Sequence, residues 1–153
     1  MFATSLALRL FHLSAAWRFR ARSGLTSFVQ IPKPLPADGF PVPLRASFLV
    51  FKKFPLLGVA TNNAAPRLVL FRERIEFRVI TRQQRRYEDI ESVAAQQAFG
   101  TQNVVVFWRR GLFAFSANLV AEDSLIALIT FCRERGISLN DRARDLLAKR
   151  PVL

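Results

Sequence analysis

The chain has 153 residues, of which 51% are hydrophobic and 15 are Phe, and it carries a formal net charge of +12. This length allows one domain with a modest core and a tail. The apolar content is too high for a wholly disordered protein. The single cysteine, Cys132, excludes an internal disulfide and a zinc site built from thiolates. No stretch reaches the roughly 18 uninterrupted apolar residues that a membrane-spanning helix needs.

The positive charge is concentrated in the first half of the chain. Residues 1–72 hold ten Lys or Arg and a single acid, Asp38, whereas residues 73–153 hold thirteen basic and ten acidic residues. A basic surplus attracts phosphate on lipids or nucleic acids. Arginine supplies 19 of the 23 basic residues, and its planar fork matches phosphate geometry. The codon bias of a GC-rich genome is the simpler explanation of the arginine content.

Residues 1–30 contain four arginines and no acid. Their apolar residues recur with helical spacing: Phe2, Leu6, Leu10, Leu13 and Trp17. Three interpretations compete: an organellar transit peptide, a helix lying on an anionic membrane, and an extension without function or with a wrongly assigned start. Leu8 and Phe11 interrupt the polar face, which favours the third.

Residues 31–43 contain five of the eight prolines and predict an extended spacer. We therefore expect a basic extension and Pro-rich linker over residues 1–44, followed by a folded unit over residues 45–139.

Alternating apolar residues predict a series of short strands in the folded unit. The expected ranges are 46–51, 68–71, 75–80, a segment around 85–87, 91–98, 104–108 and 112–117. Residues 91–98 are also compatible with a helix by propensity. Residues 54–66 contain Gly58, Asn62, Asn63 and Pro66 and predict a loop.

One amphipathic helix is expected to close the folded unit. Glu122 and Asp123 would occupy its first turn, and Gly136 would end it. Its apolar stripe includes Cys132, which we expect to be buried and unreactive. A shorter helix over residues 141–149, capped by Asn140, is expected in the tail at residues 140–153.

Two segments carry a resemblance to a known family. They are LVLFRERIEFRVITRQQRRYEDIESV at residues 68–93, and FAFSA at 113–117 together with SLIALITFCRERGISL at 124–139. In order and pattern they resemble the pleckstrin-homology-like domains, particularly the bacterial versions. The resemblance implies a mostly β (α+β) fold of about seven short antiparallel strands in a small sheet or barrel, capped by one C-terminal amphipathic helix. It also implies a binding function.

The resemblance does not extend to phosphoinositide recognition. The family's lipid binders usually carry basic residues in the loop between the first two strands. The corresponding residues here, 54–66, contain no Lys or Arg, and only Lys52, Lys53 and Arg67 flank them. Loose electrostatic contact with an anionic surface is still compatible with the sequence.

The sequence offers no recognisable catalytic set. The only histidine, His12, lies in the N-terminal segment, away from any nucleophile in the folded unit. Glu88, Asp89 and Glu91 cluster among arginines, as expected of a solvated, salt-bridged corner. No Gly-rich phosphate loop or metal-ligand pattern is present. We therefore predict a non-enzymatic protein without a cofactor or bound metal.

The best binding candidates are basic residues in the second quarter of the folded unit: Arg72, Arg74, Arg78, Arg82, Arg85 and Arg86. We expect Arg78 and Arg82 to share the outer face of one strand, with Arg85 on its neighbour. Charges at exposed strand positions also keep sheet edges from pairing, and that structural explanation is the simpler one.

The function expected from the sequence is therefore that of an interaction module, which docks on a protein partner or loosely on an anionic membrane. It would be cytoplasmic or peripheral at a membrane. The alternative is a basic nucleic-acid-binding protein, in which Tyr87 and Trp108 would stack on bases. The nearly balanced charge of residues 73–153 argues against that alternative.

Overall fold

The structure is a computed structural model that describes residues 30–98 and 100–149. The interpretations of residues 1–29 and of the last residues of the tail lie outside this part. The fold is mostly β, and its strands are β1 (Phe40–Pro41), β2 (Leu44–Phe51), β3 (Phe54–Asn62), β4 (Arg67–Leu70), β5 (Arg74–Arg78), β6 (Arg82–Arg86), β7 (Ile90–Ala98), β8 (Thr101–Trp108), β9 (Phe113–Leu119) and β10 (Ser138–Leu139).

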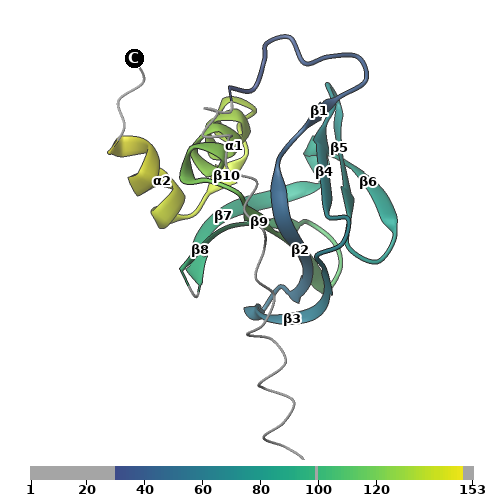
Figure 1. Ribbon diagram of the computed structural model, residues 1–153. Helices are drawn as coiled ribbons and strands as arrows, with labels where there is room; N and C mark the ends of the chain where they lie inside the picture. Colours follow the sequence, from purple (N-terminus) through teal and green to yellow (C-terminus); the bar gives the residue numbers. More distant parts are fainter. Residues whose placement is uncertain (1–29, 99, 150–153) are drawn as a thin grey trace, which may run out of the picture.

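The strands form two open sheets, as Figure 1 shows. The smaller sheet has the order β1-β4-β5-β6, and the larger has the order β10-β7-β8-β9-β2-β3. Neighbouring strands in both sheets are antiparallel except for β10, which runs parallel to β7. The expected mostly β fold is thus confirmed, but the described sheets do not close into a barrel, because each has two free edges.

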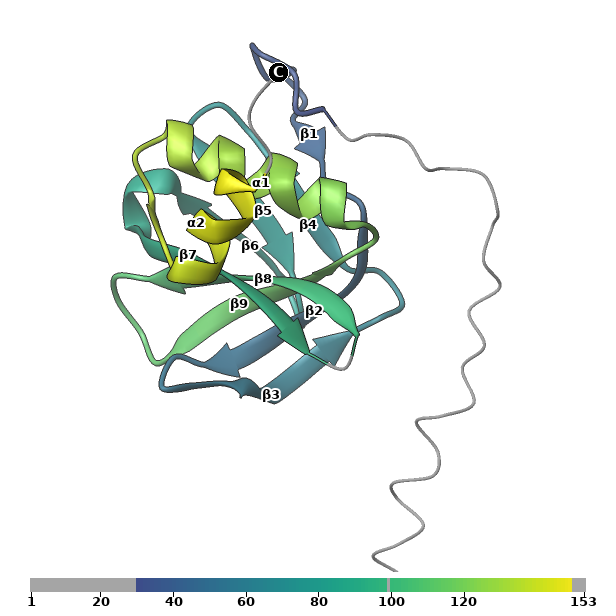
Figure 2. The ribbon, with the colours of Figure 1, turned by 90° about the vertical axis from the view of Figure 1, so that its left-hand side faces the viewer.

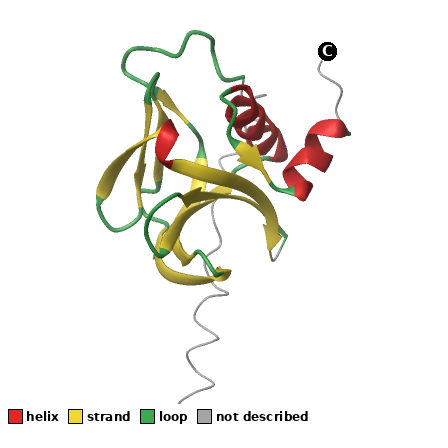
Figure 3. Ribbon diagram, turned by 180° about the vertical axis from the view of Figure 1, so that it is seen from behind, coloured by secondary structure: helices red, strands yellow, loops and turns green. Residues whose placement is uncertain are grey.

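Two helices follow the strands: α1 (Glu122–Glu134) and α2 (Asp141–Ala148). The acids Glu122 and Asp123 occupy the first turn of α1. Gly136 follows its last turn with φ of +73°, a conformation that glycine adopts without strain. Asn140 caps α2, since its side-chain oxygen accepts a hydrogen bond from the Ala143 N–H at 3.0 Å. These expectations are confirmed, and Figure 3 shows both helices on one side of the strands.

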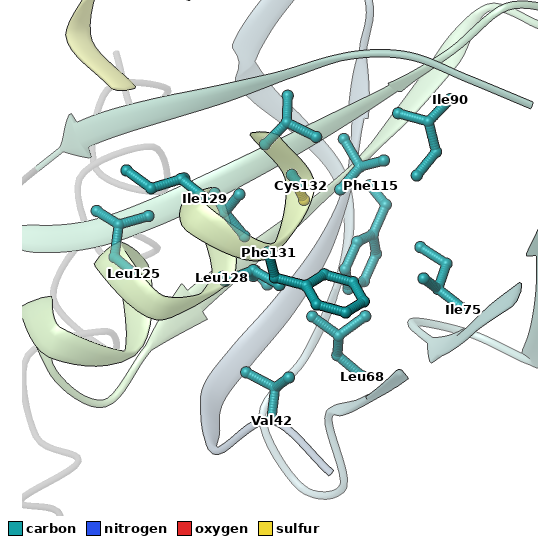
Figure 4. Close-up of a cluster of buried hydrophobic side chains, with 14 of the residues drawn as sticks. Val42, Leu68, Ile75, Ile90, Phe115, Leu125, Leu128, Ile129, Phe131 and Cys132 are labelled. Carbon is teal, nitrogen blue, oxygen red and sulfur yellow. The ribbon is translucent and has the colours of Figure 1, made fainter. Parts of the chain in front are cut away.

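The main core lies where α1 faces the inner sides of the two sheets (Figures 2 and 4). Alternate positions of β4, β5, β8 and β9 point into it, while the helix contributes residues three and four apart. Its members include Leu68, Phe77, Val104, Phe115, Leu125, Ile129 and Cys132. Phe77 stacks on Trp108 with ring centroids 5.2 Å apart. Burial raises the pKa of the Cys132 thiol to about 12.

One sequence prediction needs correction. Residues 54–66 were expected to form a loop, but most of them form β3, which pairs with β2 at one edge of the large sheet. Gly58, Asn62 and Asn63 suggest a loop by composition, yet Gly58 and Asn62 both pair with residues of β2. Residues 91–98 form a strand, as predicted, and not the helix that their propensity also allows, because β7 pairs with β8 along its length.

The Pro-rich segment packs on the domain. Val42 is a member of the main core, and Ile31 and Leu35 pack against it. β1 pairs with β4, and Gly39, with φ of +85°, lies directly over the smaller sheet. The core therefore extends beyond the folded unit expected at residues 45–139. It includes Val42 before this range and Ala143 of α2 after it.

Replacing Gly39 by Ala should destabilise this junction. An added Cβ would lie 2.5 Å from Val69 Cγ1 and 2.8 Å from Phe71 Cε1, on a backbone that L-residues rarely adopt. We expect a loss of roughly 1–3 kcal/mol in the free energy of unfolding, measured by urea denaturation. Gly58→Ala is the control, since nothing lies within 4 Å of its Cβ position. Equal stability of the two variants would contradict the packing described.

Candidate functional site

The outer face of the small sheet carries five arginines, which we call the arginine face. The register places Arg74 opposite Arg86, and Arg78 opposite both Arg67 and Arg82. Directly opposed residues of antiparallel strands point to the same side. The arginine face therefore consists of Arg67, Arg74, Arg78, Arg82 and Arg86.

One carboxylate, that of Glu76, lies at the centre of the arginine face. Its side chain is fully buried, yet Arg67 Nε and Arg82 Nη2 each donate to it at 2.6 Å. Gln84 donates a third hydrogen bond at 3.2 Å. The hydrogen bond from Arg82 is the main reason that the pKa of Glu76 falls from 4.5 to about 2, and burial opposes this shift. Two of the five arginines are thus part of a structural ion-pair cluster.

The structure only partly assembles the arginines expected from the sequence. Arg78 and Arg82 share a face but not a strand, because the chain turns between them and Arg82 opens β6. Arg85 points to the opposite face of β6, where its guanidinium lies 5.8 Å from the Trp108 ring centroid. Arg72 lies in the turn between β4 and β5, 3.5 Å from Glu73.

Sequence reasoning missed Arg67, which the register places beside Arg78. The available signal was the position of Arg67 at the start of a strand, two residues before Val69, because residues two apart in a strand point to the same face. Within the described residues, Arg78 has no ion-pair partner. Arg86 pairs with Glu88 at 3.0 Å, and Arg74 lies over the Phe71 ring.

A second surface, unforeseen from the sequence, lies at the junction of β2 and β3. Phe51 pairs with Phe54, but the next pair along β2 is Val50 with Gly58, so residues 55–57 have no counterpart on β2. This bulge turns its apolar side chains outward. Leu56 is 75% exposed and Leu57 is 59% exposed.

The turn between β8 and β9 extends this surface. Phe51 pairs with Phe113, and their ring centroids are 5.2 Å apart. The Lys52 N–H donates to the Leu112 carbonyl at 2.9 Å, and the Leu112 side chain is 74% exposed. We call the combined surface the apolar tip, which consists of Phe51, Phe54, Leu56, Leu57, Leu112 and Phe113.

The two hairpins of the apolar tip contribute basic residues and no acid. The sequence has no acid between Asp38 and Glu73, or between Glu91 and Glu122, so neither hairpin contributes one. Lys52 contacts Glu91 at 2.7 Å and the Trp108 carbonyl at 2.6 Å. Lys53 and Arg110 are exposed, and neither has an ion-pair partner among the residues that the structure describes.

The other candidates from the sequence occupy structural positions. Tyr87 is half-buried and donates a hydrogen bond to the Phe71 carbonyl at 2.8 Å, and Trp108 is buried. Glu88 and Glu91 are exposed and each forms an ion pair, as expected of a solvated corner. Residues 30–98 and 100–149 contain no group of three acidic, His or Cys side chains placed to hold a metal ion. They also contain no helix long and apolar enough to cross a bilayer.

No protein-family model matches the chain, and no curated protein matches it.

Glu76→Gln should destabilise the fold by about 1–3 kcal/mol, because it removes charged hydrogen bonds while leaving the exposed guanidiniums hydrated. The native carboxylate has a lowered pKa of about 2 against an ordinary value of 4.5. Its contribution is therefore complete above pH 4.5 and is lost as the pH falls towards 2. Urea denaturation at several pH values should show the difference between native and variant shrinking in that range.

Glu88→Gln is the matched control for the buried carboxylate. It removes an exposed ion pair with Arg86 and should change stability little. A Glu76→Gln variant as stable as Glu88→Gln at neutral pH would show that the cluster under the arginine face is not structural.

Proposed function

We propose that this chain is a docking module that attaches peripherally to anionic membrane surfaces through the apolar tip. The observation that carries the proposal is the combination, at one end of the domain, of protruding apolar side chains and unpaired cations. The role is one of binding, and no catalytic residue is assigned.

The apolar part of the attachment would come from the bulge and the adjoining turn. Exposed contiguous apolar patches on small domains mark sites that a partner or a membrane covers. Burying one leucine side chain contributes about 1.5–3 kcal/mol. Leu56, Leu57 and Leu112 would enter the interfacial region of a bilayer, with the aromatic rings of Phe51 and Phe113 behind them.

The electrostatic part would come from Lys53 and Arg110. A cation near an anionic membrane surface contributes about 1 kcal/mol. Acids at the tip would oppose attachment, and the sequence has none in either hairpin. Arg78, Arg74 and the other members of the arginine face add to the positive field of the domain.

Two other occupants fit the tip less well. Addition of a partner strand to the edge of β3 needs a regular run of free backbone groups. The bulge at residues 55–57 interrupts that run, and Pro55 has no N–H to donate. A second copy of the chain would bring Lys53 and Arg110 towards the same charges on its partner. A protein partner of apolar and acidic character is the alternative that the experiment below distinguishes.

The proposal includes a pleckstrin-homology-like fold for the domain. It is supported by the sequence of short antiparallel strands followed by α1, and by the position of α1 against the inner faces of both sheets. Such a module would be cytoplasmic and peripheral at the membrane.

Replacing both Leu56 and Leu57 by Ser should weaken attachment of the full chain to vesicles of phosphatidylcholine and phosphatidylserine by roughly 10- to 100-fold. Sedimentation of the vesicles measures the bound fraction. Any charge-driven contribution from residues 1–29 is the same in every variant, so it cancels in the comparison. Pure phosphatidylcholine vesicles should retain less of the native chain, since they lack the anionic charge.

The matched control replaces two exposed apolar residues elsewhere, in the double variant with Ile80→Ser and Val120→Ser. These side chains are 72% and 41% exposed and lie outside the tip. The control should bind as the native chain does. Loss of binding to the same extent in both double variants, or in neither, would reject attachment through the tip and leave the protein partner as the explanation of the apolar surface.

A further inference from the structure

A groove of about 720 Å³ lies on the domain, between the Pro-rich segment, the turn joining β4 and β5, and the end of α1. Its walls are formed by residues 32–37, 71–74 and three residues of the helix end, Phe131, Glu134 and Arg135. None of these residues belongs to the apolar tip. The volume is in the range of sites that take small molecules.

Two aromatic residues, Phe71 and Phe131, line the groove, and Tyr87 contacts both of them. Tyr87 donates its hydroxyl hydrogen to the Phe71 carbonyl at 2.8 Å and lies edge-on to Phe131, with ring centroids 5.7 Å apart. Burial raises the pKa of Tyr87 above its ordinary value. Tyr87 therefore links Phe131 of α1 to the backbone of Phe71, and we call these three residues the aromatic unit.

Two guanidinium groups lie on this aromatic unit. The Arg135 group lies 4.3 Å from the Tyr87 ring centroid and 4.5 Å from that of Phe131. The Arg74 group lies 4.4 Å from the Phe71 ring centroid. A guanidinium over a ring face is attracted by the ring, and its N–H donors can still reach an anion. Both arginines line the groove.

The remaining charges of the groove pair with one another. Lys33 contacts Glu134 at 2.6 Å, which also holds the Pro-rich wall against α1. Arg72 lies 3.5 Å from Glu73. Arg74 and Arg135 are left without a carboxylate partner among the described residues, so the groove has two oriented and uncompensated positive charges.

We propose that this groove binds a phosphomonoester group, held by the guanidinium forks of Arg74 and Arg135. A phosphate carries up to two negative charges and several acceptor oxygens at neutral pH, which suits two planar donors. The phosphate can belong to a soluble metabolite or to a lipid headgroup, and the chemistry of recognition is the same. The site is separate from membrane attachment through the apolar tip and does not depend on it.

The test is titration of the full chain with glycerol 3-phosphate, followed by amide chemical shifts in NMR and by calorimetry, with glycerol as the uncharged comparison. Arg74→Gln and Arg135→Gln should each weaken binding by about tenfold, since each removes charged hydrogen bonds. Arg78→Gln on the same strand and Arg133→Gln on the same helix are the controls, and each should change the affinity less than about twofold. Thermal unfolding of each variant shows whether it is folded. If Arg135→Gln does not fold, the result with Arg74→Gln is sufficient to test the site.

A second titration distinguishes the sources of the phosphate. Vesicles containing phosphatidic acid are compared with vesicles containing phosphatidylserine, using the chain with Leu56→Ser and Leu57→Ser so that the apolar tip contributes little. Preference for phosphatidic acid that disappears with Arg74→Gln supports a lipid source, and binding of glycerol 3-phosphate supports a soluble one. Absence of both, or equal loss in the Arg78→Gln and Arg133→Gln controls, overturns the proposal.

Discussion

The fold depends on the burial of the apolar face of α1 between two sheets that do not close on each other. The small sheet brings Leu68, Ile75 and Phe77 to this interface, and the large sheet brings Val104 and Phe115. Figure 4 shows Leu68, Ile75 and Phe115 near the helix. Neither sheet buries its inner face alone, because an apolar sheet face is covered only when another layer packs against it. The helix completes the core of both, and the two-residue strand β10 and helix α2 then follow it along the edge of β7.

Charge has different roles in different parts of the domain. On the small sheet, Arg67 and Arg82 neutralise the buried Glu76 and thereby belong to the structure. Lys53 and Arg110 at the apolar tip have no acidic partner among the described residues, and the same is true of Arg74 and Arg135 in the groove, so these four cations are available to an anion from outside. A count of arginines along the sequence cannot separate these two roles, because the distinction depends on which strand lies opposite which.

The elements in which apolar residues recur at regular spacing were predictable from the sequence. The helix over Leu125–Cys132 and the hairpin around Glu73 follow directly from apolar spacing and appear as expected. The shape at β3 was not predictable, because Gly58 and Pro66 suggest a loop, whereas pairing with β2 extends the segment and leaves a bulge. Burial of Glu76 also escaped prediction, since its two arginine partners come from neighbouring strands and its burial depends on their register. The groove requires the Pro-rich segment to fold back on α1, which no local pattern specifies.

The buried thiol of Cys132 can report when α1 separates from the sheets. It is the only cysteine of the chain, and its raised pKa leaves almost no thiolate at neutral pH while the core is intact. An alkylating reagent can therefore react at an appreciable rate only when α1 separates from the sheets. The rate of labelling at one sulfur then measures how often the helix leaves the core, without a probe having to be introduced.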